Sequence, residues 1–210
     1  DAYMCAGGLP IRNKSNPIDT VLAALEIQNS MKRMNALFVE RNEDPWELRI
    51  GINTGEVIAG VVGIKRFAYD IWGSTVNVAS RLETSCEPGM MNVSGSTYAE
   101  IEPFFECTYR GKIATKNTGE IDMYYVHRIK PGLSEDEEGI YPNEKFKKYV
   151  DLHLFSSINY KKAERHIMKV LKDKLLSKSR GAQQLVGLSA AFVFSDLTNL
   201  CVESSSPPSP

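Results

Sequence analysis

The sequence has few cysteines and histidines, and neither type is grouped as a metal site or a disulfide framework requires. Its cysteines are Cys5, Cys86, Cys107 and Cys201. They form no CxxC pair, so the sequence indicates neither a zinc site nor paired disulfides, and it favours reduced intracellular thiols. The three histidines have no catalytic or metal-binding partner at a useful spacing, so we assign them no role.

Long apolar runs and an excess of one charge are also absent. A membrane-spanning helix needs roughly 18 to 20 apolar residues, and the longest run, near residues 185–194, is too short. With 25 basic and 26 acidic residues the net charge is -1, which gives no sign of a nucleic-acid-binding surface. No signal peptide is visible, and the chain begins at Asp1 rather than at methionine, so the sequence leaves open what precedes it.

The 210 residues, of which 42% are apolar, fit one domain with a buried core and an appendage. Residues 1–6 indicate the end of a strand. Asn16 as N-cap with Pro17 at the first helical position predicts a helix, whose apolar residues continue at helical spacing to Phe38. Residues 48–52 alternate apolar and polar, and residues 57–62 form a glycine-flanked apolar run, so we predict two neighbouring strands.

The remaining elements follow from the same periodicities. We predict a buried strand at 90–93, a short helix at 96–101, and antiparallel strands at 106–114 and 123–129 that close the sheet. The domain organisation is then a first domain at 1–130, an acidic linker at 131–142, a lysine-rich helical extension at 143–178 and a tail at 179–210. The tail is almost uncharged and ends in serines and prolines, so we predict that it is disordered.

The most informative stretch is residues 67–83, which places a carboxylate, an amide and a guanidinium within reach of one nucleotide. Asp70 lies in a short aromatic and β-branched run that predicts a strand, and residues 73–75 supply the turn and cap of a helix. Asn77 and Arg81 are four residues apart, so they share one face of that helix. Taken singly, such residues more often cap a turn or form a surface ion pair. The complete string is what favours a nucleotide site.

The pattern Asp-Ile-Trp-Gly-x-Thr-Val-Asn-x-Ala-Ser-Arg in this stretch follows a glycine-punctuated Gly-Ile-x-x-Gly-x-Val-x-Ala-Gly pattern that begins at Gly51. Together they closely resemble the catalytic domain of class III nucleotidyl cyclases, and the resemblance runs from Asp1 to about Arg128. It implies an α+β, ferredoxin-like domain with an antiparallel or mixed sheet and helices on one face. Because the resemblance begins inside the domain, we expect the domain to be incomplete at its N-terminus.

The resemblance also implies a reaction and a role for each residue. A class III cyclase attacks the α-phosphate of a nucleoside triphosphate with the ribose 3′-hydroxyl and expels pyrophosphate. Arg81 would stabilise charge on the transferring phosphate, and Asn77 would orient the ribose. Asp70 would accept a hydrogen bond from the adenine 6-amino group, which favours ATP. Guanine presents a carbonyl oxygen there, and a buried unsatisfied polar pair costs about 1 to 3 kcal/mol.

In the family two aspartates hold two Mg²⁺ or Mn²⁺ ions per site. Asp1 matches the second of them, as part of a Gly-Asp-x-Tyr pattern, and the first belongs to a segment that this sequence does not contain. One carboxylate does not complete a Mg²⁺ site, and without the resemblance a terminal aspartate is a solvated end. Many relatives bind the triphosphate with a lysine where Thr118 stands here. Lys116 could compensate, and a solvated surface lysine is an equal alternative.

The sequence therefore predicts an adenylate cyclase of intracellular signal transduction whose active site is shared across a dimer. One subunit, in a homodimer, would supply the metal carboxylates and the other Asp70, Asn77 and Arg81. This fragment alone is expected to be inactive. The alternatives are a guanylate cyclase and a non-catalytic cyclase-homology module that dimerises or regulates. We place the catalytic domain in the cytoplasm, with any membrane attachment of a full-length protein in N-terminal regions outside this sequence.

Overall fold

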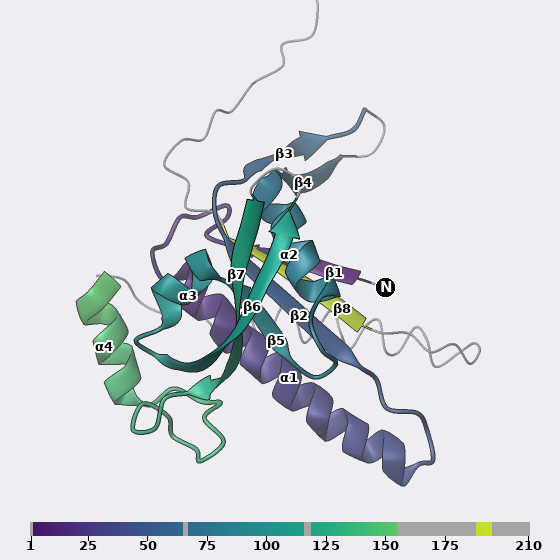
Figure 1. Cartoon of the computed structure of the whole chain (residues 1–210), viewed down its shortest axis with the longest axis vertical. Coiled ribbons are helices and arrows are strands. Elements are labelled where there is room, and N and C mark those ends of the chain that lie inside the picture. Colours follow the sequence, from purple (N-terminus) through teal and green to yellow (C-terminus); the bar gives the residue numbers. More distant parts are fainter. Residues whose placement is uncertain (1, 65–66, 116–118, 155–187, 195–210) are drawn as a thin grey trace, which may run out of the picture.

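A six-stranded mixed sheet dominates the computed structural model, which describes residues 2–64, 67–115, 119–154 and 188–194 (Figure 1). In sheet order the strands are β1 (Ala2–Gly7), β8 (Leu188–Phe194), β2 (Leu48–Thr54), β5 (Met91–Ser94), β7 (Gly119–Ile129) and β6 (Phe105–Thr115). The first four run parallel, whereas β7 is antiparallel to both β5 and β6. The predicted α+β class is confirmed, and so are the antiparallel strands that close the sheet.

Helices lie on both faces of this sheet. Side chains alternate along a strand, and Ile50 and Ile52 of β2 pack in the cluster formed with α1 (Asn16–Glu40) and α3 (Gly95–Ile101). Gly51, between them, faces α2 (Ser74–Thr84) on the opposite side. The expectation of helices on one face therefore holds for α1 and α3, and α2 occupies the other face.

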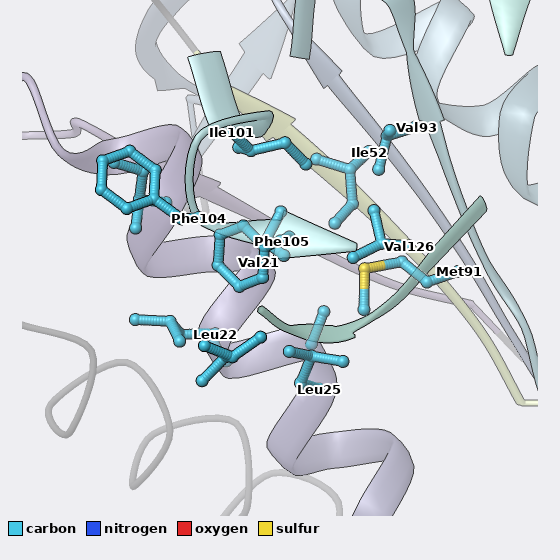
Figure 2. Packing of buried hydrophobic residues seen from close by; sticks show 14 of the residues in the cluster. Val21, Leu22, Leu25, Ile52, Met91, Val93, Ile101, Phe104, Phe105 and Val126 are labelled. Carbon is cyan, nitrogen blue, oxygen red and sulfur yellow. The ribbon is translucent and has the colours of Figure 1, made fainter. Parts of the chain in front are cut away.

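The main core lies between α1 and the sheet (Figure 2). The first half of α1 is buried, and its aliphatic residues meet side chains from β2, β5 and β7. The labelled members are Val21, Leu22, Leu25, Ile52, Met91, Val93, Ile101, Phe104, Phe105 and Val126. Burial of this much apolar surface is the main stabilising contribution that the structure shows.

The N-terminus of α1 differs by one residue from its prediction. Ser15 is the N-cap, and Asn16 is already helical. The Ser15 hydroxyl donates a hydrogen bond of 2.8 Å to the Asp19 carboxylate, whereas Asn16 donates to the Asn13 carbonyl at 2.6 Å. Proline at the next position remains compatible with the first turn, because the amide it lacks would have no intrahelical partner there.

The prediction that residues 57–62 form a strand beside β2 is wrong. β3 (Ile58–Val62) pairs with β4 (Ala68–Trp72) in a separate two-stranded antiparallel sheet that projects from the main sheet (Figure 1). Most of its large apolar side chains are exposed, with Ile58 at 67% and Val61 at 65% of full exposure. Both edges of β2 are already paired, with β8 and β5. A short apolar run cannot by itself distinguish a buried strand from an exposed arm.

The acidic segment 131–142 is folded against the core. Leu133 is buried, and the Asp136 carboxylate accepts hydrogen bonds from the Ser134 hydroxyl and from the amides of Ile140 and Tyr141. Burial alone would raise the pKa of Asp136, but these hydrogen bonds lower it below its usual value. The Asp136 carboxylate thus stabilises the turn between Ser134 and Tyr141 through these hydrogen bonds.

The helical extension shares the core of the preceding domain. α4 (Glu144–Leu154) buries Phe146 and Val150 in the cluster that also contains Phe104 and Phe105. Residues 143–154 therefore do not form a second hydrophobic core. The rest of the predicted extension, at 155–178, lies outside the described residues.

Within the tail predicted to be disordered, the structure describes residues 188–194, and these form β8. For these residues the structure differs from the expectation. They carry no charge, include valine and two phenylalanines, and find backbone partners on both sides in β1 and β2. The other tail residues lie outside the described ranges. Among the described helices, none is long and apolar enough to cross a membrane.

We predict that Gly51→Ala lowers the free energy of unfolding by at least about 2 kcal/mol, because an added methyl group overlaps backbone atoms of Ala79 and Glu83 in α2. Urea denaturation measures the change. Gly60→Ala is the matched control, since the nearest atom to its added methyl is a Trp72 ring carbon at 3.7 Å. Equal stability of the two variants would contradict the close contact of α2 with β2.

Candidate functional site

A single residue, Gly73, separates the strand that carries Asp70 from the helix that carries Asn77 and Arg81. Gly73 has φ = 140°, in the region that favours glycine, so it turns the chain sharply from β4 into α2. It is also the N-cap, and the helix has no side-chain cap. The side-chain cap predicted from residues 73–75 is therefore absent. The Thr75 hydroxyl instead donates a hydrogen bond of 2.6 Å to the Glu56 carbonyl.

Asn77 and Arg81 lie on the side of α2 that is not buried against the sheet. The opposite side of the helix buries Val78, Ala79 and Leu82, whereas Asn77 is exposed and Arg81 is partly exposed. Arg81 Nη1 donates a hydrogen bond of 3.1 Å to the carbonyl of Ala114 at the end of β6. The structure thus brings together the predicted amide and guanidinium on one outward surface.

Asp70 stands on the projecting arm, opposite Gly60 of β3. It is partly buried, and its Oδ1 accepts a hydrogen bond of 2.8 Å from the Ile71 amide. β4 contacts α2, so the carboxylate lies on the element that adjoins the helix. Within the described part of the chain no hydrogen bond joins Asp70 to Asn77 or Arg81, and a ligand would have to bridge them.

One residue that the sequence prediction missed, Asn53, holds the start of α2 in place. Asn53, at the end of β2, is 6% exposed, and its Nδ2 donates to the Thr75 carbonyl at 3.1 Å. Its Oδ1 accepts a hydrogen bond of 3.2 Å from the Ser96 hydroxyl at the start of α3. The sequence contained one signal for this role, an asparagine at the end of an otherwise apolar strand. A polar side chain that is buried there is expected to form hydrogen bonds with neighbouring elements.

The metal part of the predicted site is not built by the described residues. Asp1 precedes the first described residue, and Lys116 and Thr118 fall in the gap at 116–118. No group of three or more histidine, cysteine or acidic side chains that could hold a metal occurs in the described ranges. The donor set that these ranges offer does not fit a Mg²⁺ site, which needs several oxygen ligands.

The three thiols within the described ranges do not form a second reactive centre. Burial raises the pKa of Cys86 to about 11 and that of Cys107 to about 12, and it raises the pKa of Cys5 as well. These three thiols are free and remain protonated at neutral pH. They are therefore poor nucleophiles, which leaves the α2 surface as the candidate site.

Comparison with known proteins finds a matching family profile, similar sequences and similar structures. The sequence profile of the adenylate and guanylate cyclase catalytic domain matches residues 1–128. An adenylate cyclase of Mycobacterium tuberculosis is 36% identical over 126 residues, which make up 60% of this chain and 28% of that protein. Guanylate cyclase 2G of Rattus norvegicus is 38% identical over 128 residues, or 60% of this chain and 12% of that protein.

Among solved structures, the adenylyl cyclase CyaB from P. aeruginosa is similar with a TM-score of 0.56 at 29% identity, covering 61% of this chain and 68% of that one. The guanylyl cyclase Cya2 is similar with a TM-score of 0.55 at 25% identity, covering 60% and 65%. This chain spans less than a third of the length of either curated relative. The adenylate cyclase and the guanylate cyclase each match 60% of this chain.

We predict that Asn53→Ala lowers the free energy of unfolding by about 1 to 3 kcal/mol, because it leaves the Thr75 carbonyl without this donor in a buried position. Hydrogen exchange should show the largest acceleration in the first turn of α2. Asn29→Ala is the control, because Asn29 is a partly exposed residue of α1. Unchanged exchange in α2 would show that Asn53 does not position the helix.

Proposed function

Because the chain belongs to the family of adenylate and guanylate cyclase catalytic domains, we propose that it supplies the nucleotide-binding half of an adenylate cyclase. The reaction would convert ATP into 3′,5′-cyclic AMP and pyrophosphate, in cyclic nucleotide signalling. The observation that carries the proposal is the outward surface of α2, where Asn77 and Arg81 lie together one tight turn after the strand of Asp70.

Arg81 is suited to stabilising the charge that develops on the transferring phosphate. Its guanidinium is permanently charged, partly exposed and held in the structure only by a neutral backbone carbonyl among the described partners. A phosphate oxygen is a stronger acceptor than a carbonyl, so a bound triphosphate can take its place. The gain would be largest where negative charge develops in the transition state.

Asn77 would act through position. It lies one helical turn before Arg81 on the same face, so a ribose that contacts its amide has its phosphates directed toward the guanidinium. Holding the 3′-hydroxyl near the α-phosphorus lowers the entropic barrier to an in-line attack. Asn53 and Thr75, which fix the start of α2, would keep this alignment and are positioning residues.

Asp70 supports the choice of ATP. Its Oδ1 is oriented by the Ile71 amide, and we assign Oδ2 as the acceptor for the adenine 6-amino group. A guanine would present its O6 acceptor to the same carboxylate, at a cost of about 1 to 3 kcal/mol. Guanylate cyclase is the second candidate, because guanylate cyclase 2G of Rattus norvegicus matches 60% of this chain at 38% identity.

The proposal includes two Mg²⁺ or Mn²⁺ ions, with Asp1 as one ligand, and a second cyclase domain as partner. Such ions would supply electrostatic stabilisation of the phosphates and help to deprotonate the hydroxyl. The described residues do not complete their site, so we assign them no step. A homodimer would place the metal carboxylates of one subunit against the α2 surface of the other. The competing proposal is a regulatory cyclase-homology module without turnover.

We predict that Asp70→Ala erodes the preference for ATP over GTP by about tenfold or more, and that it lowers total turnover less. The assay mixes this chain with a cyclase domain that keeps both metal aspartates and has its own arginine replaced by alanine, and it measures both cyclic nucleotides. Asp44→Ala, at an exposed carboxylate, is the control. A wild-type mixture that used GTP at least as well as ATP would refute the role of Asp70.

In the same mixture, we predict that wild-type chain restores cyclic AMP formation with Mg²⁺ or Mn²⁺, and that Arg81→Ala restores none. The chain alone should be inactive. Because Arg81 acts on the transition state, its loss should lower kcat and kcat/KM together and leave ATP affinity nearly unchanged. Arg41→Ala, at an exposed arginine beyond α1, should restore activity fully. Mixtures that form heterodimers and stay inactive would favour the regulatory module.

A further inference from the structure

Trp72 is a large, exposed aromatic residue to which the proposed function assigns no role. It is the last residue of β4 and lies two residues after Asp70, so both side chains are on the same face of the strand. Gly73 follows it and turns the chain into α2. Trp72 therefore lies between the carboxylate that we assign to the adenine base and the helix that carries Asn77.

The face of the arm that carries Asp70 and Trp72 is open to solvent. Ile71, on the opposite face of β4, packs in the small apolar cluster that contains Ala79 of α2. Ile58 is paired with Trp72, shares its face and is largely exposed. A ligand can consequently reach this face of the arm, as it can reach the outward surface of α2.

A glycine lies beside the Asp70 carboxylate on this face. Gly60 is opposite Asp70 in the register of β3 and β4, and it has no side chain to occupy the space next to the carboxylate. Cζ3 of the Trp72 ring is 3.7 Å from the position that a Cβ atom of Gly60 would have. The indole thus extends across the glycine that faces Asp70, and Trp72 remains 38% exposed. A flat apolar ring therefore lies next to a hydrogen-bond acceptor.

This combination of groups has the chemistry that a purine base needs. The face of a base stacks on an aromatic side chain, and the stacking energy depends little on which base it is. Side chains two residues apart on a strand are separated by about 7 Å, which is comparable to the length of a purine. A base whose 6-amino group meets Asp70 can therefore cover the Trp72 ring and still direct its sugar toward α2.

We propose that Trp72 is a base-binding residue on which the purine ring of the nucleotide stacks, while Asp70 selects adenine through its edge. The stacking role rests on the proposed function, since both residues would contact one nucleotide. Trp72 supplies affinity for any purine, Asp70 supplies the preference, and Gly60 leaves space for the base. The competing account is structural, with an indole that only shields the backbone of Gly60.

The first experiment measures tryptophan fluorescence of the full chain. The sequence has two tryptophans, so Trp46→Phe leaves Trp72 as the only one. ATP should quench its emission, because a stacked base would cover the indole, and inorganic tripolyphosphate should not. The matched control is Trp72→Phe, whose remaining Trp46 contacts Phe38 of α1 and should not respond to ATP.

Equilibrium dialysis of ATP against the same chain separates two kinds of failure. Bound ATP with unchanged Trp72 emission would refute the stacking role and leave the proposed function intact. Absence of bound ATP would overturn both the stacking role and the proposed nucleotide-binding half.

The second experiment measures kinetics in the mixture of this chain with the cyclase domain that lacks its own arginine. Trp72→Leu keeps an apolar cover over Gly60 but loses the aromatic face, so it should raise KM for ATP about tenfold with little change in kcat. Trp72→Phe keeps a ring and should stay within about twofold of the unsubstituted chain. Tyr69→Leu, at an exposed aromatic residue on the other face of β4, should leave KM unchanged.

The two accounts of Trp72 differ in these kinetics. Stacking does not discriminate between purines, so Trp72→Leu should weaken ATP and GTP by the same factor, whereas Asp70→Ala should change their ratio. Equal KM values for Trp72→Phe and Trp72→Leu, or a loss confined to kcat, would overturn the stacking role and favour the structural one. Failure of the proposed function would instead appear as no cyclic AMP from the unsubstituted mixture.

Discussion

The close approach of α2 to β2 at Gly51 is the contact on which the candidate site depends. Only a residue without a side chain lets the backbone of Ala79 and Glu83 lie against the strand. The Asn53 hydrogen bond to Thr75 then fixes the helix along its axis. With one face held in this way, the outward direction of Asn77 and Arg81 follows from helical geometry alone. The exposed polar surface of α2 therefore depends on the close packing of the opposite face of the helix against β2.

The local sequence pattern correctly predicted a strand in the projecting arm of β3 and β4, but it did not predict that this strand is exposed to solvent. Val61 and Ile58 have the composition of a buried strand, yet they face solvent. Exposed apolar residues in one contiguous region are typical of interaction surfaces. This arm also carries Asp70, so any domain that covers its apolar side chains would lie close to the residue that we assign to the adenine base.

Much of the site was predictable because its determinants are local. The strand of Asp70, the glycine turn and the i, i+4 spacing of Asn77 and Arg81 lie within a few residues of one another, and the structure has them as predicted. The roles of Asn53 and of Gly51 were not predicted. Their partners in α2 are more than twenty residues away in the sequence, and nothing in the local pattern identifies them.

Periodicity and motif spacing are local properties, so they were sufficient to predict the order of helices and strands from β1 to α4, the shared face of Asn77 and Arg81, and the family to which the chain belongs. They could not predict which strands pair, that α2 lies opposite α1, that α4 joins the main core, or that residues 188–194 enter the sheet. Strand pairing joins backbone groups that are distant in the chain. All strands offer the same donors and acceptors, so the choice of partner depends on which edges the rest of the fold leaves open.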